Sequence, residues 1–400
     1  MKSLKPILKS SSFQARGTSC MLGTKASSSC QGSSSFCLLS PVLQNHHHQN
    51  NNIRSFHRSI PIPQNNHTDP SQYVLFEEIP LQECIAMLER DDPKRAAEQK
   101  ANKIEHLSSS QHRGEFSAKQ TKTIGVVTIN RPEKMNSLCP ETAVQFKALF
   151  ESEKIQGNRN LAAVVLMGAP PPPPIQMEDG SVKQVHAAFS AGGDYDFLLE
   201  RTDDTPFNNA VRMSKFYDSF LSPMLRVCPS PVIACINGHA VGAGLGLACA
   251  ADIRVMEASA KMSFNFVKIG LSPGMGASHI LPYLVGHQVA SYMLLTGDLI
   301  TAEKAKEFGV VLEVLQGQKA VKHRAFEIAV QIAKSSHIAS LLCLHSLRVQ
   351  KLAGITACMY RESDAQVQSF ADEELRQHLL EMKNKEEARL KSKEKPKPNN

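Results

Sequence analysis

The chain has 400 residues, of which 42% are hydrophobic, and a formal net charge of +7. Residues 1–68 carry all of this charge, because they contain seven Lys or Arg and no Asp or Glu, and residues 69–400 are neutral overall. A neutral body argues against an electrostatic nucleic-acid surface. No apolar run reaches the ~18 residues of a membrane span. We therefore expect neither nucleic acid nor membrane among the partners.

The leader, residues 1–68, is rich in Ser, Lys and Arg and lacks acids, which is typical of an organelle transit peptide. Segment 54–59 (RSFHRS) looks like the sequence before a processing site. We predict import into the mitochondrial matrix, with the plastid as the alternative destination. The remaining alternative is a disordered tail that is not cleaved.

Ten cysteines are present, and none forms a paired motif such as CxxC. Three lie in the leader, and the others are scattered through apolar contexts. This pattern predicts reduced thiols in the core and no metal site.

After the leader, strand and helix patterns alternate along the chain. The expected strands are 72–78, 124–129, 162–167, 232–236, 252–256, 261–266 and 310–315. The expected helices are 83–106, 140–153, 207–227, 247–251, 274–285 and 301–308, the last with Thr301 as its N-cap, and then a helical region from 319 to about 391. This alternation predicts an α/β core over 69–316 and a helical C-terminal region over 317–400.

Two insertions interrupt the predicted core. Residues 80–122 form a long charged segment between the first two strands, for which the sequence indicates no function. Residues 169–186 begin with five consecutive prolines, Pro170 to Pro174, which cannot lie inside a strand. We expect an exposed loop there, either a plain surface insertion or a segment that acts as a lid or interacts with a partner.

Two small-residue turns are the candidate functional features. In 231–254, a buried strand runs into a turn with Gly242, Gly244 and Gly246 and then into a helix, whose first turn presents unpaired N–H groups and a partial positive charge. A second turn, Ala191 to Asp194, follows the strand 162–167. Each turn could supply one N–H to the same oxygen and stabilise negative charge there. The alternative is two purely structural turns.

Together with INRPEKMNSL (129–138) and GLSPGMG (270–276), these turns resemble the crotonase family, also called the enoyl-CoA hydratase/isomerase family, from about Gln72 to Leu315. The resemblance implies a ββα spiral core and assembly as a homotrimer or hexamer. It also implies an acyl-CoA thioester as substrate, so that coenzyme A is part of the substrate and no separate cofactor is needed.

By resemblance, the catalytic groups are the backbone N–H groups of Gly193 and Ala243, which would stabilise an enolate. The residues that would contact the substrate are Lys134, Met135, Ala191, Gly192, Asp194, Tyr195 and Gly242. Lys134 would meet a CoA phosphate, or else it is a solvated surface lysine.

The sequence departs from the family where relatives carry carboxylates for proton transfer. The three matching positions are Gly246, Phe266 and Gly274. Two interpretations therefore stay open: a lyase or isomerase with atypical proton-transfer groups, or a non-catalytic acyl-CoA-binding homologue. A third, an RNA-binding relative, is disfavoured by the neutral body.

Several polar residues near the turns have simple structural interpretations. Asp194 is expected to cap the helix after it, and Asp252 to order the turn between a helix and a strand. His239 is expected to be a hydrogen-bonded turn residue, and Lys268 to face solvent or a phosphate. Tyr195 and Asp196 directly follow a proposed donor, so a role in chemistry is hardest to dismiss for them.

Overall fold

The structure of the protein is a computed structural model that describes residues 72–91, 122–173, 175–176, 182–183 and 186–391. All of them belong to the compact unit Ser59–Asn400. The predicted leader, most of the first insertion and the last nine residues lie outside the described residues, so what the sequence suggests for them stays a prediction.

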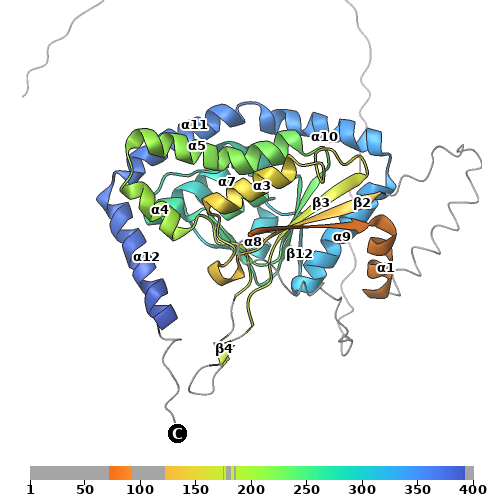
Figure 1. The fold of residues 1–400 in the computed structure, drawn as a ribbon, viewed down its shortest axis with the longest axis horizontal. Coiled ribbons are helices and arrows are strands. Elements are labelled where there is room, and N and C mark those ends of the chain that lie inside the picture. Colours follow the sequence, from red (N-terminus) through yellow and green to blue (C-terminus); the bar gives the residue numbers. More distant parts are fainter. Residues whose placement is uncertain (1–71, 92–121, 174, 177–181, 184–185, 392–400) are drawn as a thin grey trace, which may run out of the picture. The chain divides into compact units, whose positions relative to one another are not determined.

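A six-stranded sheet forms the centre of the fold (Figure 1). In spatial order its strands are β1 (Val74–Pro80), β2 (Thr123–Ile129), β3 (Leu161–Gly168), β7 (Val232–Ile236), β9 (Ile253–Glu257) and β12 (Glu313–Leu315). β1 and β2 pair antiparallel, and every other neighbouring pair is parallel. The strand expected at 252–256 is thus β9, and the one expected at 310–315 is the shorter β12.

Both faces of this sheet are buried, which explains the continuous apolar runs of its central strands. In β3, Ala163 and Val165 contribute to one hydrophobic cluster, whereas Val164 and Leu166 contribute to another. Helix α9 (Gln318–Lys334) packs in the first cluster. Helices α3 (Pro140–Phe150) and α5 (Pro206–Ser222) pack in the second. The alternating side chains of each strand thus bury two separate cores.

A second sheet has four short strands. In spatial order these are β11 (Ile300–Thr301), β10 (Lys261–Ser263), β8 (His239–Val241) and β6 (Ala188–Ser190). The chain repeatedly places one strand in the large sheet, the next in the small sheet, and then a helix. The helices of these repeats are α4 (Tyr195–Thr202) with α5 after β3 and β6, α6 (Ala243–Ala250) after β7 and β8, and α7 (Ala277–Thr296) after β9 and β10. This repeat is the predicted ββα spiral.

Two predicted boundaries were wrong around the small sheet, and two of its strands were not predicted. The glycine-rich turn is confined to Gly242, at φ 53°, and α6 already begins at Ala243, so that Gly244 and Gly246 are helical. Gly244 is required because a Cβ there would lie 2.6 Å from Ser190. The strand expected at 261–266 ends at Ser263, where the 3₁₀ helix η3 (Asn265–Ile269) follows. β6 and β8 have three residues each, which is too short for an alternating pattern to reveal.

The C-terminal region is helical, as predicted. Its helices after α9 are α10 (His337–Leu352), α11 (Ile355–Phe370) and α12 (Glu373–Lys391). The short helix α8 (Ala302–Glu307) has the predicted N-cap, because the Thr301 hydroxyl accepts a bond from the Lys304 N–H. Helix α5 continues into the π-helical turn η2 (Pro223–Val227), which completes the helix expected at 207–227.

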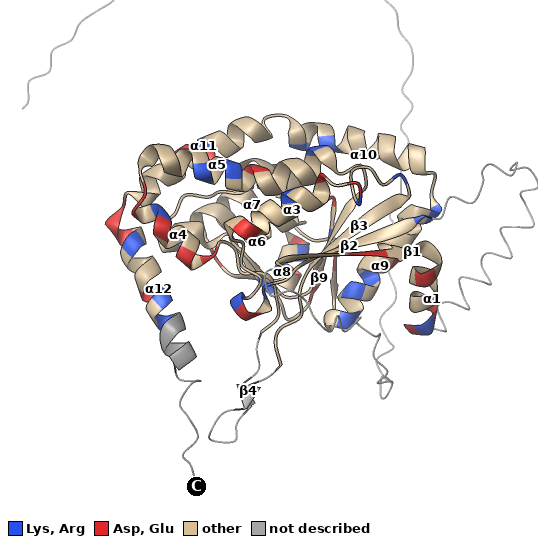
Figure 2. Cartoon of the chain, viewed as in Figure 1, with Lys and Arg blue, Asp and Glu red and all other residues tan. Residues whose placement is uncertain are grey.

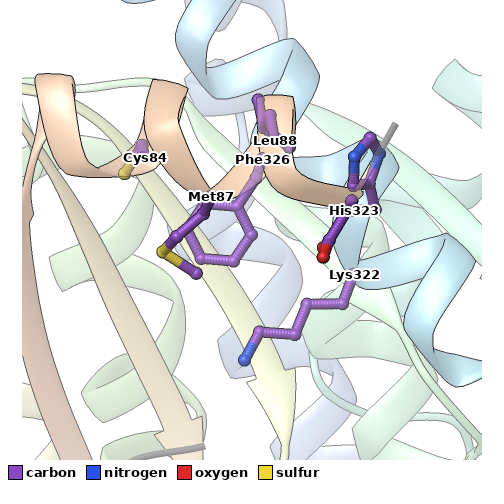
Figure 3. A pocket seen from close by; sticks show the side chains of 7 residues that line it. Cys84, Met87, Leu88, Lys322, His323 and Phe326 are labelled. Carbon is purple, nitrogen blue, oxygen red and sulfur yellow. The ribbon is translucent and has the colours of Figure 1, made fainter. Parts of the chain in front are cut away.

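The described parts of the two insertions are ordered. In the first, helix α1 (Leu81–Asp91) packs on α9, and Cys84, Met87 and Leu88 line a gap of only about 10 Å³ against Phe326 (Figure 3). In the second, β4 (Ile175–Gln176) and β5 (Val182–Lys183) pair antiparallel beyond the prolines. The segment expected to be an exposed loop therefore contains a two-stranded ladder.

Charged residues of both signs lie on the helices, whereas β2 and β3 carry none (Figure 2). Within the described residues, no helix combines the length and the apolar character needed to cross a bilayer.

Seven described cysteines are free thiols, and all are buried except Cys343, for which the prediction of a core thiol was wrong. Burial raises the pKa of Cys84, Cys235 and Cys358 to about 12 and that of Cys228 and Cys249 to about 11. At pH 10 the folded protein keeps these protons, whereas the unfolded chain, with thiol pKa values near 9, releases them. Their stabilisation is complete below pH 9 and is lost as the pH rises toward 11–12.

We therefore expect the unfolding free energy to be lower at pH 10 than at pH 8, by about 1 kcal/mol for each buried thiol. The urea midpoint should fall accordingly. Lys351, whose pKa is lowered by burial to about 8, acts in the opposite direction but is a single group. Cys235→Val should reduce the difference, and Cys343→Val should leave it unchanged. An identical midpoint at both pH values would contradict this account.

Candidate active site

A cavity of about 30 Å³ lies where the two small-residue turns meet. The turn Ala191 to Asp194 lies directly against the start of α6, because a Cβ on Gly192 would be 2.7 Å from the Val241 oxygen and 3.4 Å from the Ala243 nitrogen. Gly192 also has φ +96°, which side-chain-bearing residues rarely adopt. The lining residues are Ala191, Gly192, Gly193, Tyr195, Leu198, Met213, Phe216, Tyr217, Gly242, Ala243, Asn265, Phe266, Ile269 and Leu271.

Two backbone N–H groups at this cavity have no protein acceptor among the described residues. Ala243 is the first residue of α6, so its N–H has no partner inside the helix, and Gly242 provides no side-chain cap. Around Gly193, Leu138 donates to the Gly192 oxygen at 2.7 Å, and the Leu138 oxygen accepts from Asp194 at 2.9 Å. These two bonds involve the residues on either side of Gly193 and do not use the Gly193 N–H. Within the described part of the chain, neither N–H donates a hydrogen bond although both residues line the cavity.

The turn Ala191 to Asp194 is held in place by residues 133–136 (EKMN) of the family-like segment 129–138. The Ala191 N–H donates to the Met135 oxygen at 3.0 Å. Met135 and Asn136 adopt positive φ values of 52° and 56°. This unusual backbone is held by the Asn136 side chain, which donates to the Ala169 oxygen at 3.0 Å and the Ala188 oxygen at 2.7 Å. The motif therefore supports the position of the donor at Gly193.

Asp194 caps α4 as predicted, because its Oδ1 accepts from the Asp196 N–H at 3.0 Å. Its Oδ2 accepts from the Arg131 guanidinium at 2.9 Å and from the Ser137 hydroxyl at 3.3 Å. The carboxylate is buried and already occupied on both oxygens. Asp194 thus ties the two family motifs together next to Gly193.

Tyr195 and Asp196, the two residues that follow Asp194, lie in different surroundings. Tyr195 lines the cavity, as expected of a substrate contact. Asp196 is not among the lining residues, and it forms ion pairs with Lys383 at 3.0 Å and Lys134 at 3.5 Å. These lysines, Lys383 first, lower the pKa of Asp196. The structure thus brings Tyr195 but not Asp196 to the cavity, and Lys134 pairs with Asp196.

A larger cavity, of about 760 Å³, shares Ala191 with the first one and is also lined by Met135. His239 lies on its wall together with His186 and Lys261. His239 belongs to β8 rather than to a turn, but it is hydrogen-bonded as expected: its Nδ1 accepts from the Lys261 N–H at 3.0 Å. Burial first, then His186 and Lys261, lower the pKa of His239, which favours a neutral imidazole at pH 7.

Protein atoms fill the space at two of the three positions where the resemblance expected carboxylates. A Cβ on Gly246 would lie 2.8 Å from the Met275 Cβ. A Cβ on Gly274 would overlap the Tyr217 hydroxyl, which donates to Gln366. Phe266, at the third position, lines the cavity.

Tyr217 is a cavity residue that sequence reasoning missed. Its position inside α5 carries no motif, and its partner Gln366 is 149 residues away, so no sequence signal pointed to the pair. Burial raises the pKa of Tyr217 well above its ordinary value. The phenol therefore stays protonated near neutral pH and can donate hydrogen bonds but not act as a base.

The packing at Gly246 gives a stability prediction. Alanine inside a helix is favoured over glycine by about 1 kcal/mol, but overpacking typically costs about 1–3 kcal/mol. Since the clash involves the Met275 Cβ, which cannot swing away, we expect Gly246→Ala to lower the unfolding free energy by about 1–2 kcal/mol net. In a Met275→Gly background the same change should be neutral or stabilising. Urea unfolding of the four proteins of this double-mutant cycle measures the coupling, and additive effects would show that the space is not filled.

No three His, Cys, Asp or Glu side chains of the described residues gather where they could hold a metal ion.

Comparison with known proteins identifies the family to which this site belongs. A sequence model of enoyl-CoA hydratase/isomerase matches residues 119–395. The chain belongs to the enoyl-CoA hydratase/isomerase family. A probable enoyl-CoA hydratase of Mycobacterium tuberculosis is 35% identical over 193 residues, which are 48% of this chain and 66% of that protein. A putative enoyl-CoA hydratase of Thermus thermophilus is 31% identical over 216 residues, covering 53% and 76% of the two chains.

The fold is that of the same family. The crystal structure of an enoyl-CoA hydratase/isomerase from Mycobacterium paratuberculosis superposes with a TM-score of 0.55 at 25% identity, covering 64% of this chain and 94% of that one. The crotonase fold inferred from the motifs is therefore confirmed.

Proposed function

We propose that this family member is an acyl-CoA thioester enzyme that stabilises an enolate with the backbone N–H groups of Gly193 and Ala243. The observation that carries this proposal is the pair of N–H groups at one small cavity that have no acceptor among the described residues. Ala243 is buried and Gly193 is half-buried, and proteins keep few buried N–H groups without partners because such groups are costly. A thioester oxygen between the two groups would satisfy both.

The electrostatic logic is that of an oxyanion hole. When a proton leaves the α-carbon, negative charge moves onto the thioester oxygen, and two fixed donors stabilise that charge without any reorganisation. The partial positive charge at the N-terminus of α6 adds to the effect at Ala243. Because both donors belong to the backbone, the residues that carry them are selected for being small.

The coenzyme A part of the ligand would lie in the larger cavity. Its volume of about 760 Å³ falls in the range that is typical of sites for drug-sized ligands. Ala191 separates it from the small cavity, and Met135 and His186 also line it. In this arrangement the thioester lies at Ala191, the acyl group in the small cavity and the nucleotide toward His186. Met135 lines the larger cavity and would contact the CoA moiety there, whereas Lys134 is not among its described lining residues and pairs with Asp196.

Proton transfer is expected to be atypical. No carboxylate, histidine or lysine is among the described residues that line the small cavity. Tyr195 and Tyr217 supply hydroxyl groups there, and Tyr217 stays protonated. We therefore place the chain among lyases or isomerases that do not use the usual glutamates.

The lack of a carboxylate, histidine or lysine among the described lining residues of the small cavity also supports a second candidate function, a non-catalytic acyl-CoA-binding homologue. Turnover decides between the two. Purified protein should be incubated with a panel of saturated, unsaturated and hydroxylated acyl-CoA thioesters, and both binding and product formation should be measured. Turnover of any thioester supports the enzyme, binding without turnover supports the binding protein, and no binding of any thioester refutes both.

We further propose that the leader directs the protein to the mitochondrial matrix, or alternatively to the plastid, and that the mature chain forms a homotrimer or hexamer. Imaging of residues 1–68 fused to a fluorescent protein tests the first proposal, and sedimentation of the chain from residue 69 tests the second. The neutral body argues against an RNA-binding role. A strongly salt-dependent RNA affinity would reverse that conclusion.

A further inference from the structure

Asn265 differs from the other polar side chains of the small cavity. Three polar side chains line it: Tyr195, Tyr217 and Asn265. The Tyr217 hydroxyl donates to Gln366, and Tyr195 also has an interaction partner. The carboxamide of Asn265 makes no hydrogen bond with any described residue. Among the described side chains of the cavity, it is the polar one left free for a ligand, in addition to the backbone N–H groups of Gly193 and Ala243.

The side chain of Asn265 lies beside the proposed oxyanion donors. Its Oδ1 is 3.3 Å from the place that a Cβ on Gly242 would occupy, and Gly242 directly precedes the donor Ala243. A thioester oxygen bound at Ala243 would therefore bring the first atoms of the acyl chain within reach of the carboxamide.

The backbone around Asn265 is fixed on both sides. The Gly242 N–H donates to the Ser263 oxygen at 2.8 Å, and the Ser263 hydroxyl donates to the Gly297 oxygen at 2.8 Å. Gly297 packs closely on Asn265, because a Cβ there would lie 3.3 Å from the Asn265 Cα. A side chain on such a supported backbone can discriminate between ligands, since it cannot simply move away from a poor one.

The rest of the cavity limits what Asn265 can bind. The other lining side chains are mostly apolar, such as Leu198, Phe216 and Leu271, and no charged side chain is among the described lining residues. A charged substituent would lack a counter-charge there. The volume of about 30 Å³ is small, so the cavity favours a short acyl chain over a long one. A carboxamide both donates and accepts, and a neutral hydroxyl can use both functions.

We propose that Asn265 is a specificity-determining residue that binds a hydroxyl group on a short acyl chain, which makes short hydroxyacyl thioesters the preferred ligands. This inference rests on the proposed thioester function. It depends on the rule that a site with a dedicated hydrogen-bonding group rejects the analogue that lacks the matching group.

The test compares the affinities of butyryl-CoA and 3-hydroxybutyryl-CoA, measured by calorimetry on the full chain. The wild type should bind the hydroxylated thioester at least tenfold more tightly. Asn265→Leu, similar in size but apolar, should abolish this ratio by weakening only the hydroxylated ligand. Asn265→Ser, which keeps a hydrogen-bonding group, should retain part of the affinity ratio. This variant also tests the proposal if the leucine variant fails to fold. Asn160→Ala, at a half-buried asparagine before β3, is the control.

The outcomes separate the two proposals. If both thioesters bind the wild type equally, or if Asn265→Leu weakens both to the same extent, the role of Asn265 is refuted while thioester binding stands. If neither thioester binds the wild type, the thioester function itself fails.

Discussion

Replacing Ala243 with proline should lower kcat for a thioester that the protein turns over by roughly 100- to 1,000-fold, the usual effect of removing one oxyanion donor. Proline has no N–H, so the change deletes the proposed donor itself. The fold should tolerate it, because Ala243 is the first residue of α6 and proline is favoured at that position of a helix. The effect corresponds to about 3 kcal/mol of transition-state stabilisation.

The measurement is steady-state kinetics together with thermal unfolding. His337→Pro is the matched control, since it makes the same change at the first residue of α10, outside the cavity. It should leave kcat and the midpoint nearly unchanged. Gly193→Pro removes the second donor and should cause a loss of similar size. If Ala243→Pro folds normally and keeps wild-type kcat, the assignment of the oxyanion donors is refuted.

The sequence identified the two turns because their signals are local. Small residues after a buried strand are readable from neighbouring positions, and the four matching segments occurred in the order of one family. Asp194 and Thr301 could be assigned as helix caps for the same reason, since a cap needs only the residues of the next turn. The central strands were also recognised, because both of their faces are buried and their apolar runs are continuous.

The part of the cavity wall outside the two turns and Tyr195 could not be predicted, because its members come together only in the folded chain. Tyr217 reaches Gln366 across 149 positions, and Met275 occupies the space beside Gly246 from a different segment. The resemblance predicted that Gly246 and Phe266 stand where relatives carry glutamates, but not that Met275 fills the space at Gly246. The short strands β6 and β8 were not predicted for another reason. Three residues are too few to show an alternating pattern, and only the pairing with neighbouring strands defines these elements.

Removing the guanidinium of Arg348 should destabilise the fold strongly, because this group holds a buried carboxylate and two carbonyl groups. It binds both oxygens of Asp252, at 3.0 and 2.6 Å. It also donates to the Cys228 oxygen at 2.7 Å and the Ser230 oxygen at 3.2 Å. The Arg348 and Asp252 side chains are only 4% and 14% exposed. Asp252 in turn accepts from the Val232 N–H at 2.8 Å, so the expected ordering role of Asp252 is confirmed.

Arg348→Met would keep much of the packing but leave a buried carboxylate and two carbonyl groups without their donor. Breaking one side of a buried ion pair typically costs about 3–5 kcal/mol, and we expect a loss of that size in urea unfolding. Lys268→Met is the control, because Lys268 pairs with Asp298 at 2.7 Å on the surface, where both side chains are about half exposed. It should cause no measurable change, since exposed pairs contribute little.

The double variant Arg348→Met/Asp252→Asn distinguishes the buried charge from lost packing. If the cost arises because Asp252 is left charged without a partner, neutralising it should recover part of the stability lost in Arg348→Met. If the cost arises only from the shape of the arginine side chain, the second change should recover nothing. The first outcome would mean that α10 holds the loops before β7 and β9 through charge, and these two strands flank α6 in the chain. The position of the Ala243 donor would then depend on an ion pair between Asp252, close to α6 in the sequence, and Arg348, 96 residues beyond Asp252.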